Sequence, residues 1–338
     1  MNFAIGNSRN SSFELLRILS QIYIVLYHLC SIWNANNLNQ DRFFTSIVIP
    51  LHIGVVVFVL ISGYFTIKAT SKGLIKLLGI FLVYRLIELA GGALQHGISF
   101  KDVLVLTRSH WWFINVYLCL FLVSPLLNLW LNKASEKQRW YMMVAFFFAA
   151  SYMAMGGVKS MADGKNLVNF ILFYLVGNQL YYYKDKWISI STKKVALVYV
   201  LFNLLLFIAS YYLYGTKGQG IINMMCFKYS SPLLLLNAIL FFILVGKLNF
   251  HSNLINYIAA SSLAIYLIHG ARPYMPLLNQ YVTENLQLTT NIDFVLFAEY
   301  SVYAIVLIVG CVFLDKMLTP LWNLINKFGS NIYIKLGF

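Results

Sequence analysis

Residues 13–30 read FELLRILSQIYIVLYHLC, a stretch apolar enough to enter a lipid bilayer although it carries Arg17 and His28. The two ionisable side chains are eleven positions apart, which on an α-helix is about three turns and about 16 Å of rise. Both therefore point to the same side of the predicted helix. Burying an arginine in a membrane costs about 2.5 to 3.5 kcal/mol on insertion scales. The alignment indicates a polar path through a helix bundle and not contact with lipid.

Each of these residues also has an ordinary structural explanation when it is taken singly. Arg17 is near one end of the stretch, where its side chain can reach the membrane surface and pair with Glu14 one turn earlier. A single histidine in an apolar helix is most often a hydrogen-bonded core residue. The alignment of Arg17 with His28 is what favours a functional site.

The composition indicates that lipid is the solvent of this chain. Of 338 residues, 60% are hydrophobic and 11% are charged, whereas soluble proteins contain about 25% charged residues. No polar stretch is long enough to form a separate domain, so residues 1–338 are predicted to form a single integral membrane domain. The net charge of +14 is attributed to membrane topology and anion binding, and not to nucleic acid. The four cysteines stand singly, without the spacing of a metal site, so no metal is expected.

Apolar stretches of about 20 residues predict an all-α, polytopic bundle of about ten membrane spans. The predicted spans are residues 12–32, 47–67, 74–95, 111–131, 141–156, 166–183, 195–214, 232–247, 254–270 and 294–318. With the N-terminus inside, the inner loops contain roughly twice as many Lys and Arg residues as the outer loops, as is typical of cytoplasmic loops. Both termini are therefore expected in the cytoplasm of a multi-pass protein of the cell membrane. Residues 98–106 (ISFKDVLVL) are predicted to form an amphipathic segment at the outer surface.

Further motifs follow the first helix in a fixed order. They are GVVVFVLISGYF (54–65), HWWFINVYLCLFLVSPLLN (110–128) and SSLAIYLIH (261–269). Together with Arg17, ten intervening residues and His28, and with Glu14 three positions before the arginine, they resemble the acyltransferase-3 family of integral membrane acyltransferases. The chain departs from the family pattern at Val56, where a polar residue is common, and after the second span, where two lysines replace a closer pair of arginines.

The resemblance implies that an acyl group crosses the membrane. The donor would be cytoplasmic acetyl-CoA, and the acceptor a hydroxyl of a cell-surface or lipid-linked sugar or polysaccharide. Arg17 and His28 would be the catalytic residues. Three lysines near the cytoplasmic end would join Arg17 in a basic mouth that binds the phosphates of CoA: they are Lys68, Lys72 and Lys76. His28 could act as a general base or as a nucleophile that carries the acetyl group, and the sequence leaves both roles open.

Several other polar and aromatic residues are candidates for substrate binding, each with a structural alternative. The candidates are His269, Trp112, Asn115, Tyr117 and Glu299. Trp111, Trp112 and Tyr117 could stack on a sugar, although an interfacial aromatic belt also explains them. Ser62, Tyr64 and Asn115 could stabilise an oxyanion, although such residues more often bridge helices. Arg85 and Glu88 are expected to form a structural ion pair inside the bundle, and a place in the substrate path is the alternative for this pair.

A transporter or flippase of a lipid-linked sugar or small metabolite is the alternative function. Ten spans with intramembrane charges suit a carrier equally well. Carriers often contain paired interrupted helices in two repeated halves, and no such pairing is visible in this sequence. A purely structural membrane subunit would leave the Arg17–His28 alignment unexplained. The motifs therefore favour a membrane-embedded O-acetyltransferase.

Overall fold

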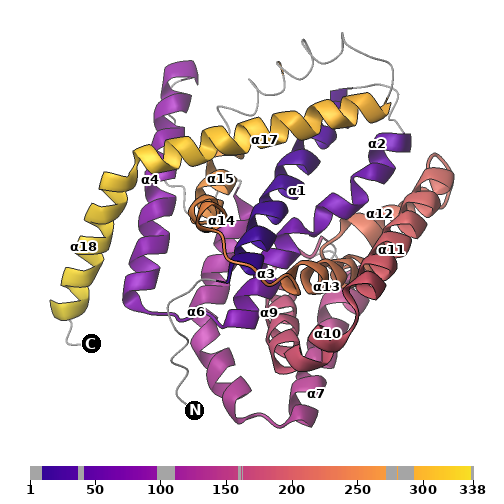
Figure 1. Cartoon of the computed structure of the whole chain (residues 1–338), viewed down its shortest axis with the longest axis horizontal. Helices are drawn as coiled ribbons and strands as arrows, with labels where there is room; N and C mark the ends of the chain where they lie inside the picture. The colour runs from indigo at the N-terminus through magenta and orange to yellow at the C-terminus, as the bar shows by residue number, and fades with distance from the viewer. Residues whose placement is uncertain are drawn as a thin grey trace.

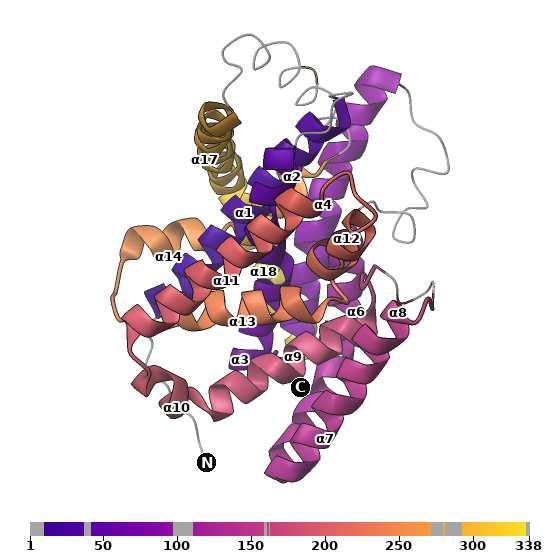
Figure 2. The ribbon, with the colours of Figure 1, turned by 90° about the vertical axis from the view of Figure 1, so that its right-hand side faces the viewer.

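The computed structural model describes residues 10–36, 42–96, 111–158, 161, 163–271, 280 and 293–335. All regular elements in these ranges are helices, which confirms the all-α class (Figures 1 and 2). The first half comprises α1 (Ser11–Asn36), α2 (Arg42–Ile47), η1 (Ile49–Ile53), α3 (Gly54–Phe65), α4 (Ser71–His96), α6 (Trp112–Lys133), α7 (Glu136–Phe147), η2 (Phe148–Tyr152) and α8 (Met153–Met155). The second half comprises α9 (Leu167–Tyr182), α10 (Lys184–Ser189), α11 (Thr192–Leu213), α12 (Gln219–Phe227), α13 (Pro232–Gly246), α14 (Asn253–Ala259), α15 (Ser262–His269), α17 (Asp293–Met317) and α18 (Thr319–Lys335).

Each predicted span coincides with one or more helices, but they differ in length. Among the described residues, five helical stretches are long and apolar enough to cross a membrane by themselves. They are Ser11–Ser31, Arg42–Phe65, Trp112–Lys133, Thr192–Leu213 and Phe294–Met317. The pair α12 and α13, bent by 44°, would be a sixth. The chain is thus a multi-pass membrane protein, whereas the number of ten spans and the cytoplasmic position of both termini stay predictions.

Helix α1 lies in the middle of the bundle, and this position brings its polar face to the functional site. It contacts α3, α13, α14, α15 and α17, and it is surrounded by other helices in both views (Figures 1 and 2). Helix α11 is peripheral, and its leucines Leu197, Leu201 and Leu205 are exposed. An exposed leucine face in so apolar a chain suits contact with lipid.

The tightest helix packing joins α3 to α9. A Cβ atom added to Gly63 would lie 2.1 Å from the carbonyl oxygen of Tyr174, and one added to Gly177 would lie 2.2 Å from that of Leu60. Only glycine permits these backbones to approach so closely, as is common where membrane helices associate. The glycine of the ISGYF motif therefore has a packing role, and it holds α3 against the core beside α1.

The predicted span 254–270 is divided into α14 and α15 by a turn at Ser261. The Ser261 hydroxyl donates a hydrogen bond at 2.7 Å to Asp315 Oδ2 on α17, and the Tyr84 hydroxyl donates one at 2.8 Å to Asp315 Oδ1. This buried carboxylate anchors the turn, and the short α15 then carries His269 toward α1. Sequence periodicity does not reveal the break, because it depends on a partner in a distant helix.

Two peripheral segments, α18 and residues 98–106, differ from the rest in how they relate to the predictions. Helix α18 was not predicted; it packs beside α4 (Figure 1), where Ile325 lies against Gly79. The predicted amphipathic segment 98–106 lies outside the described residues.

Candidate functional site

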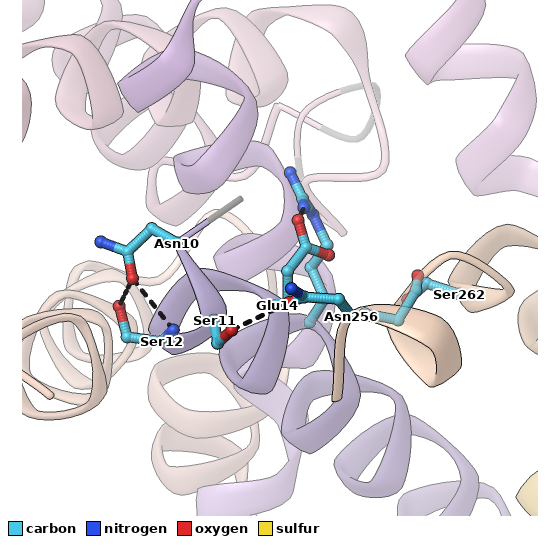
Figure 3. Close-up of polar contacts among 8 residues, drawn as sticks. Asn10, Ser11, Ser12, Glu14, Asn256 and Ser262 are labelled. Atoms are coloured by element: carbon cyan, nitrogen blue, oxygen red, sulfur yellow. Dashed lines mark hydrogen bonds and ion pairs between the residues drawn. The ribbon is translucent and has the colours of Figure 1, made fainter. Parts of the chain in front are cut away.

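The first turn of α1 sets the position of Arg17. Asn10 caps the helix, because its Oδ1 accepts a hydrogen bond at 3.1 Å from the backbone N–H two residues later. The Ser11 hydroxyl donates to Asn256 Oδ1 at 3.0 Å and thereby joins α1 to α14 (Figure 3). Glu14 Oε1 lies 2.5 Å from Arg17 Nη1, so the expected pair is present.

A cavity of about 540 Å³, here called the Arg17 cavity, lies beside this pair. The Arg17 side chain is 30% exposed and that of Glu14 only 9%, so the guanidinium is held from the protein side and remains accessible. The polar lining consists of Glu14, Arg17, Gln21, Ser62, Tyr117, Ser262 and Tyr266. Gln21 Nε2 donates to the Ser262 carbonyl at 2.7 Å, whereas Gln21 Oε1 is buried without a partner among the described residues.

Two smaller cavities adjoin the other end of this helix face. The histidine cavity, of about 230 Å³, is lined by His28, His52, Trp111, Trp112 and neighbouring residues. The lysine cavity, of about 370 Å³, shares His28 and His52 and extends to Lys165 and Lys228. Both cavities also share one aromatic wall, formed by Tyr27, Trp112 and Tyr229.

The Arg17 cavity and the histidine cavity meet at three shared side chains, here called the neck. Ile24, Val55 and Tyr266 line both, so these side chains form the boundary between them. Arg17, Gln21, Ile24 and His28 follow one another at spacings of four, three and four residues, which keeps them on one helix face. The alignment predicted for Arg17 and His28 is therefore present, and the two side chains face successive cavities.

His28 contacts a second histidine from a distant part of the chain. His28 Nδ1 lies 3.1 Å from His269 Nε2, and His269 Nδ1 lies 2.6 Å from the Ile265 carbonyl oxygen. A carbonyl can only accept, so His269 Nδ1 must carry a hydrogen. His269 is 3% exposed and has no carboxylate partner among the described residues, which favours its neutral form, because an unpaired buried charge is costly. Its Nε2 is then an acceptor.

The tautomer of His28 follows from this chain of hydrogen bonds. If His269 Nε2 accepts, His28 Nδ1 donates, and the lone pair of neutral His28 lies on Nε2. Within the described residues no hydrogen bond engages His28 Nε2, and His28 lines both the histidine and the lysine cavity. The arrangement resembles the orienting hydrogen bond of a hydrolase triad, with a neutral imidazole in place of the carboxylate.

Comparison with known proteins decides the family. A family model described as an acyltransferase domain, Acyl_transf_3, matches residues 10–316. The chain belongs to the acyltransferase-3 family. No curated protein and no solved structure matches the chain. The resemblance of the motifs is confirmed, and the chain is a membrane acyltransferase.

The residues predicted for substrate binding in this acyltransferase divide between the cavities. Trp112 lines the two cavities beside His28, whereas Tyr117 lines the Arg17 cavity, with its hydroxyl 3.2 Å from Ser62 Oγ. His269 contacts His28 directly. Asn115 and Glu299 line none of the cavities described above. Of the oxyanion candidates, Ser62 faces the Arg17 cavity, and Tyr64 is buried in the core.

The three lysines predicted to join Arg17 in a basic mouth lie outside the Arg17 cavity. Lys68, Lys72 and Lys76 are exposed, and none of them lines the Arg17 cavity, although Leu77 does. Their role in a basic mouth stays a prediction.

Arg85 and Glu88 form the expected ion pair. No group of three or more His, Cys, Asp or Glu side chains in the described part of the chain could hold a metal ion.

Several residues that line the cavities have no role assigned from the sequence, among them Gln21, His52, Lys165 and Tyr266. Gln21 carried a usable signal, because it is four residues after Arg17 and seven before His28. His52 and Lys165 carried none, since they reach the site only through the packing of η1 against α1 and of the segment before α9 against the turn between α12 and α13.

Proposed function

We propose that this membrane acyltransferase moves an acetyl group from cytoplasmic acetyl-CoA to a hydroxyl of a cell-surface or lipid-linked sugar. The observation that carries the proposal is the position of His28: it lines both the histidine and the lysine cavity, and the histidine cavity shares three lining residues with the Arg17 cavity. The donor would occupy the Arg17 cavity and the acceptor the histidine and lysine cavities.

The Arg17 cavity has the chemistry to receive the donor. The buried Glu14 carboxylate orients the Arg17 guanidinium, which is 30% exposed, so its remaining N–H groups can donate to the phosphates of CoA even though the ion pair itself is neutral. Gln21 Oε1, buried and without a partner, can accept a hydrogen bond from a pantetheine amide. The thioester would then reach the neck at Ile24, Val55 and Tyr266 from the Arg17 side.

Direct transfer with His28 as general base is the mechanism that this geometry supports best. The acceptor hydroxyl oxygen attacks the thioester carbonyl carbon while His28 Nε2 takes the hydroxyl proton. The C–S bond then breaks, and the imidazolium returns that proton to the CoA thiolate. His28 Nδ1 continues to donate to His269 Nε2 throughout, which keeps the ring oriented. Separate cavities on the two sides allow both substrates to bind together, so no covalent acetyl-histidine is required.

Purified protein in detergent micelles, supplied with radiolabelled acetyl-CoA and candidate glycans, tests the proposal. We expect transfer that is lost in His28→Ala and retained in His251→Ala, since His251 is exposed and lines none of these cavities. Without acceptor, no label should remain on His28. A stable acetyl group on His28 would replace the general-base mechanism by nucleophilic catalysis. Uptake of a sugar into liposomes without any need for acetyl-CoA would instead indicate a carrier.

A further inference from the structure

The lysine cavity has a charged wall that the proposed function has not used. Its charged residues within the described part of the chain are Asp163, Lys165 and Lys228. Lys228 forms an ion pair with Asp163, and this hydrogen bond holds the pKa of the Asp163 carboxyl below its usual range. Asp163 therefore stays ionised at neutral pH and offsets one lysine. The wall retains a net charge of +1, and Lys165 is in no ion pair among these residues.

Lys165 is held in place by its surroundings. The Tyr229 N–H donates to the Asp163 carbonyl at 3.1 Å, which ties the segment before α9 to the turn between α12 and α13. Between the two charged residues, Gly164 has a φ of +66°, and a Cβ there would lie 2.3 Å from the Ser230 nitrogen. Glycine is thus required for the segment to lie so close to that turn. The Lys165 ammonium then sits over the Trp112 ring, 5.4 Å from its centroid.

A continuous wall of rings connects Lys165 with the catalytic histidine. From Trp112 the wall passes to Tyr229, with ring centroids 5.1 Å apart, and then to His52, stacked on Tyr229 at 4.7 Å. Tyr27 follows at 4.6 Å from His52 and lies 6.0 Å from His28. Flat rings of this kind suit the apolar faces of a sugar.

His52 provides an independent sign that a ligand completes this wall. The residue is 7% exposed, and its Nε2 is buried without a hydrogen-bond partner among the described residues. An unpaired buried polar group is costly, so a bound hydroxyl is a natural partner for this nitrogen. An acceptor with one hydroxyl at His28 Nε2 would therefore place a second near His52 and the rest of its body near Lys165.

We propose that the lysine cavity is an acceptor site for an anionic sugar, whose phosphate or carboxylate is bound by Lys165 and whose second hydroxyl pairs with His52. This inference rests on the proposed function, because it assumes that the acceptor reacts at His28. The proposal restricts the acceptor to acidic sugars, because the Lys165 ammonium would bind an anionic group and would gain nothing from a neutral sugar.

Protection of His28 from carbethoxylation by diethylpyrocarbonate, followed by mass spectrometry, tests this site without turnover. The probes are glucose 6-phosphate, glucuronate and glucose, with protein in a neutral detergent. We expect each anionic probe to protect His28 at concentrations at least about tenfold lower than glucose does. Lys165→Gln should abolish this difference, and the exposed control Lys217→Gln should retain it.

Several outcomes would overturn the inference. They are equal protection by glucose and the anionic probes, protection by none of them, and a difference that survives in Lys165→Gln. A further arm adds phosphatidylglycerol to the micelles: if the lipid alone protects His28 through Lys165, the site binds a lipid headgroup and no sugar. Transfer that still depends on His28 while charge discrimination fails would remove only this inference, whereas loss of that dependence would remove the proposed function itself.

Discussion

The two sides of His28 differ in how their polar groups are satisfied. In the Arg17 cavity the charged and hydroxyl groups mostly pair within the protein, Arg17 with Glu14 and Ser62 with Tyr117. Beyond the neck, the Nε2 atoms of His28 and His52 have no partner among the described residues. A cavity of about 540 Å³ with an oriented guanidinium suits a large, anionic substrate that binds through one end. The two smaller cavities, with their unpaired nitrogens, suit a ligand that supplies several hydrogen bonds, as a sugar does.

The largest effect on acetyl transfer is expected when the imidazole of His28, which lies between the donor and acceptor cavities in the proposed mechanism, is removed. We expect His28→Ala to lower the rate of acetyl transfer about 10³-fold, because a positioned base typically contributes 10²- to 10⁴-fold. Initial rates with radiolabelled acetyl-CoA measure the loss, and His251→Ala is the matched control. A residual rate within about threefold of the unchanged protein would show that His28 is not the base.

The partner of His28 comes second in expected effect. His269→Leu removes the acceptor of the His28 Nδ1–H bond, so we expect kcat to fall about 30- to 100-fold with little change in KM for either substrate. His269→Gln can still accept through its side-chain oxygen and should recover part of the activity. Equal losses in the two variants would mean that His269 supports the fold and does not orient His28.

A substitution of Arg17 tests donor binding in the Arg17 cavity. We expect Arg17→Gln to raise KM for acetyl-CoA about 10- to 30-fold, because a charge-assisted contact to phosphate is lost. KM for S-acetylpantetheine, which has no phosphate, should change less than about threefold in the same preparation. A double variant with Glu14→Gln checks that a buried unpaired carboxylate is not the cause. An equal rise for both donors would place the phosphates elsewhere.

The smallest effect is expected at Gln21, which lies between Arg17 and His28 on the polar face of α1. Gln21→Met keeps the side-chain volume but removes both the unpaired Oε1 and the Nε2 hydrogen bond to the Ser262 carbonyl, so we expect KM for acetyl-CoA to rise about threefold. The kcat should stay within about twofold, since Gln21 is distant from the reacting hydroxyl in this scheme. Steady-state kinetics at saturating acceptor separate the two constants. An unchanged KM would mean that no donor amide reaches this oxygen.

Much of the fold was predictable because it depends on local composition. Every predicted apolar stretch coincides with one or more helices, since a lipid-solvated backbone must satisfy its hydrogen bonds internally. The break at Ser261 was not predictable, because it depends on packing between helices, as the hydrogen bond from Ser261 to Asp315 illustrates. The start of α13 after the bend, by contrast, has a local signal, since Ser231 caps the helix and Pro232 opens it.

The site was predictable only along a single helix. The spacing of Arg17 and His28 reveals their common face, because the helical period is a local property. The pair of His28 with His269 joins residues 241 positions apart, and no periodicity connects them. Lys165 lies between two predicted spans, and nothing near it in the chain indicates that it sits over Trp112.

The sequence by itself determined that this chain belongs in a membrane, that it folds into helices, and that the Arg17 guanidinium and the His28 imidazole share one face of a helix. Those properties follow from composition and a fixed rise per residue. Only the tertiary structure decided which nitrogen of His28 is free, which cavities it faces and which charge stands at their far end. Each of these depends on contacts between distant helices, and such contacts exist only after the bundle has packed.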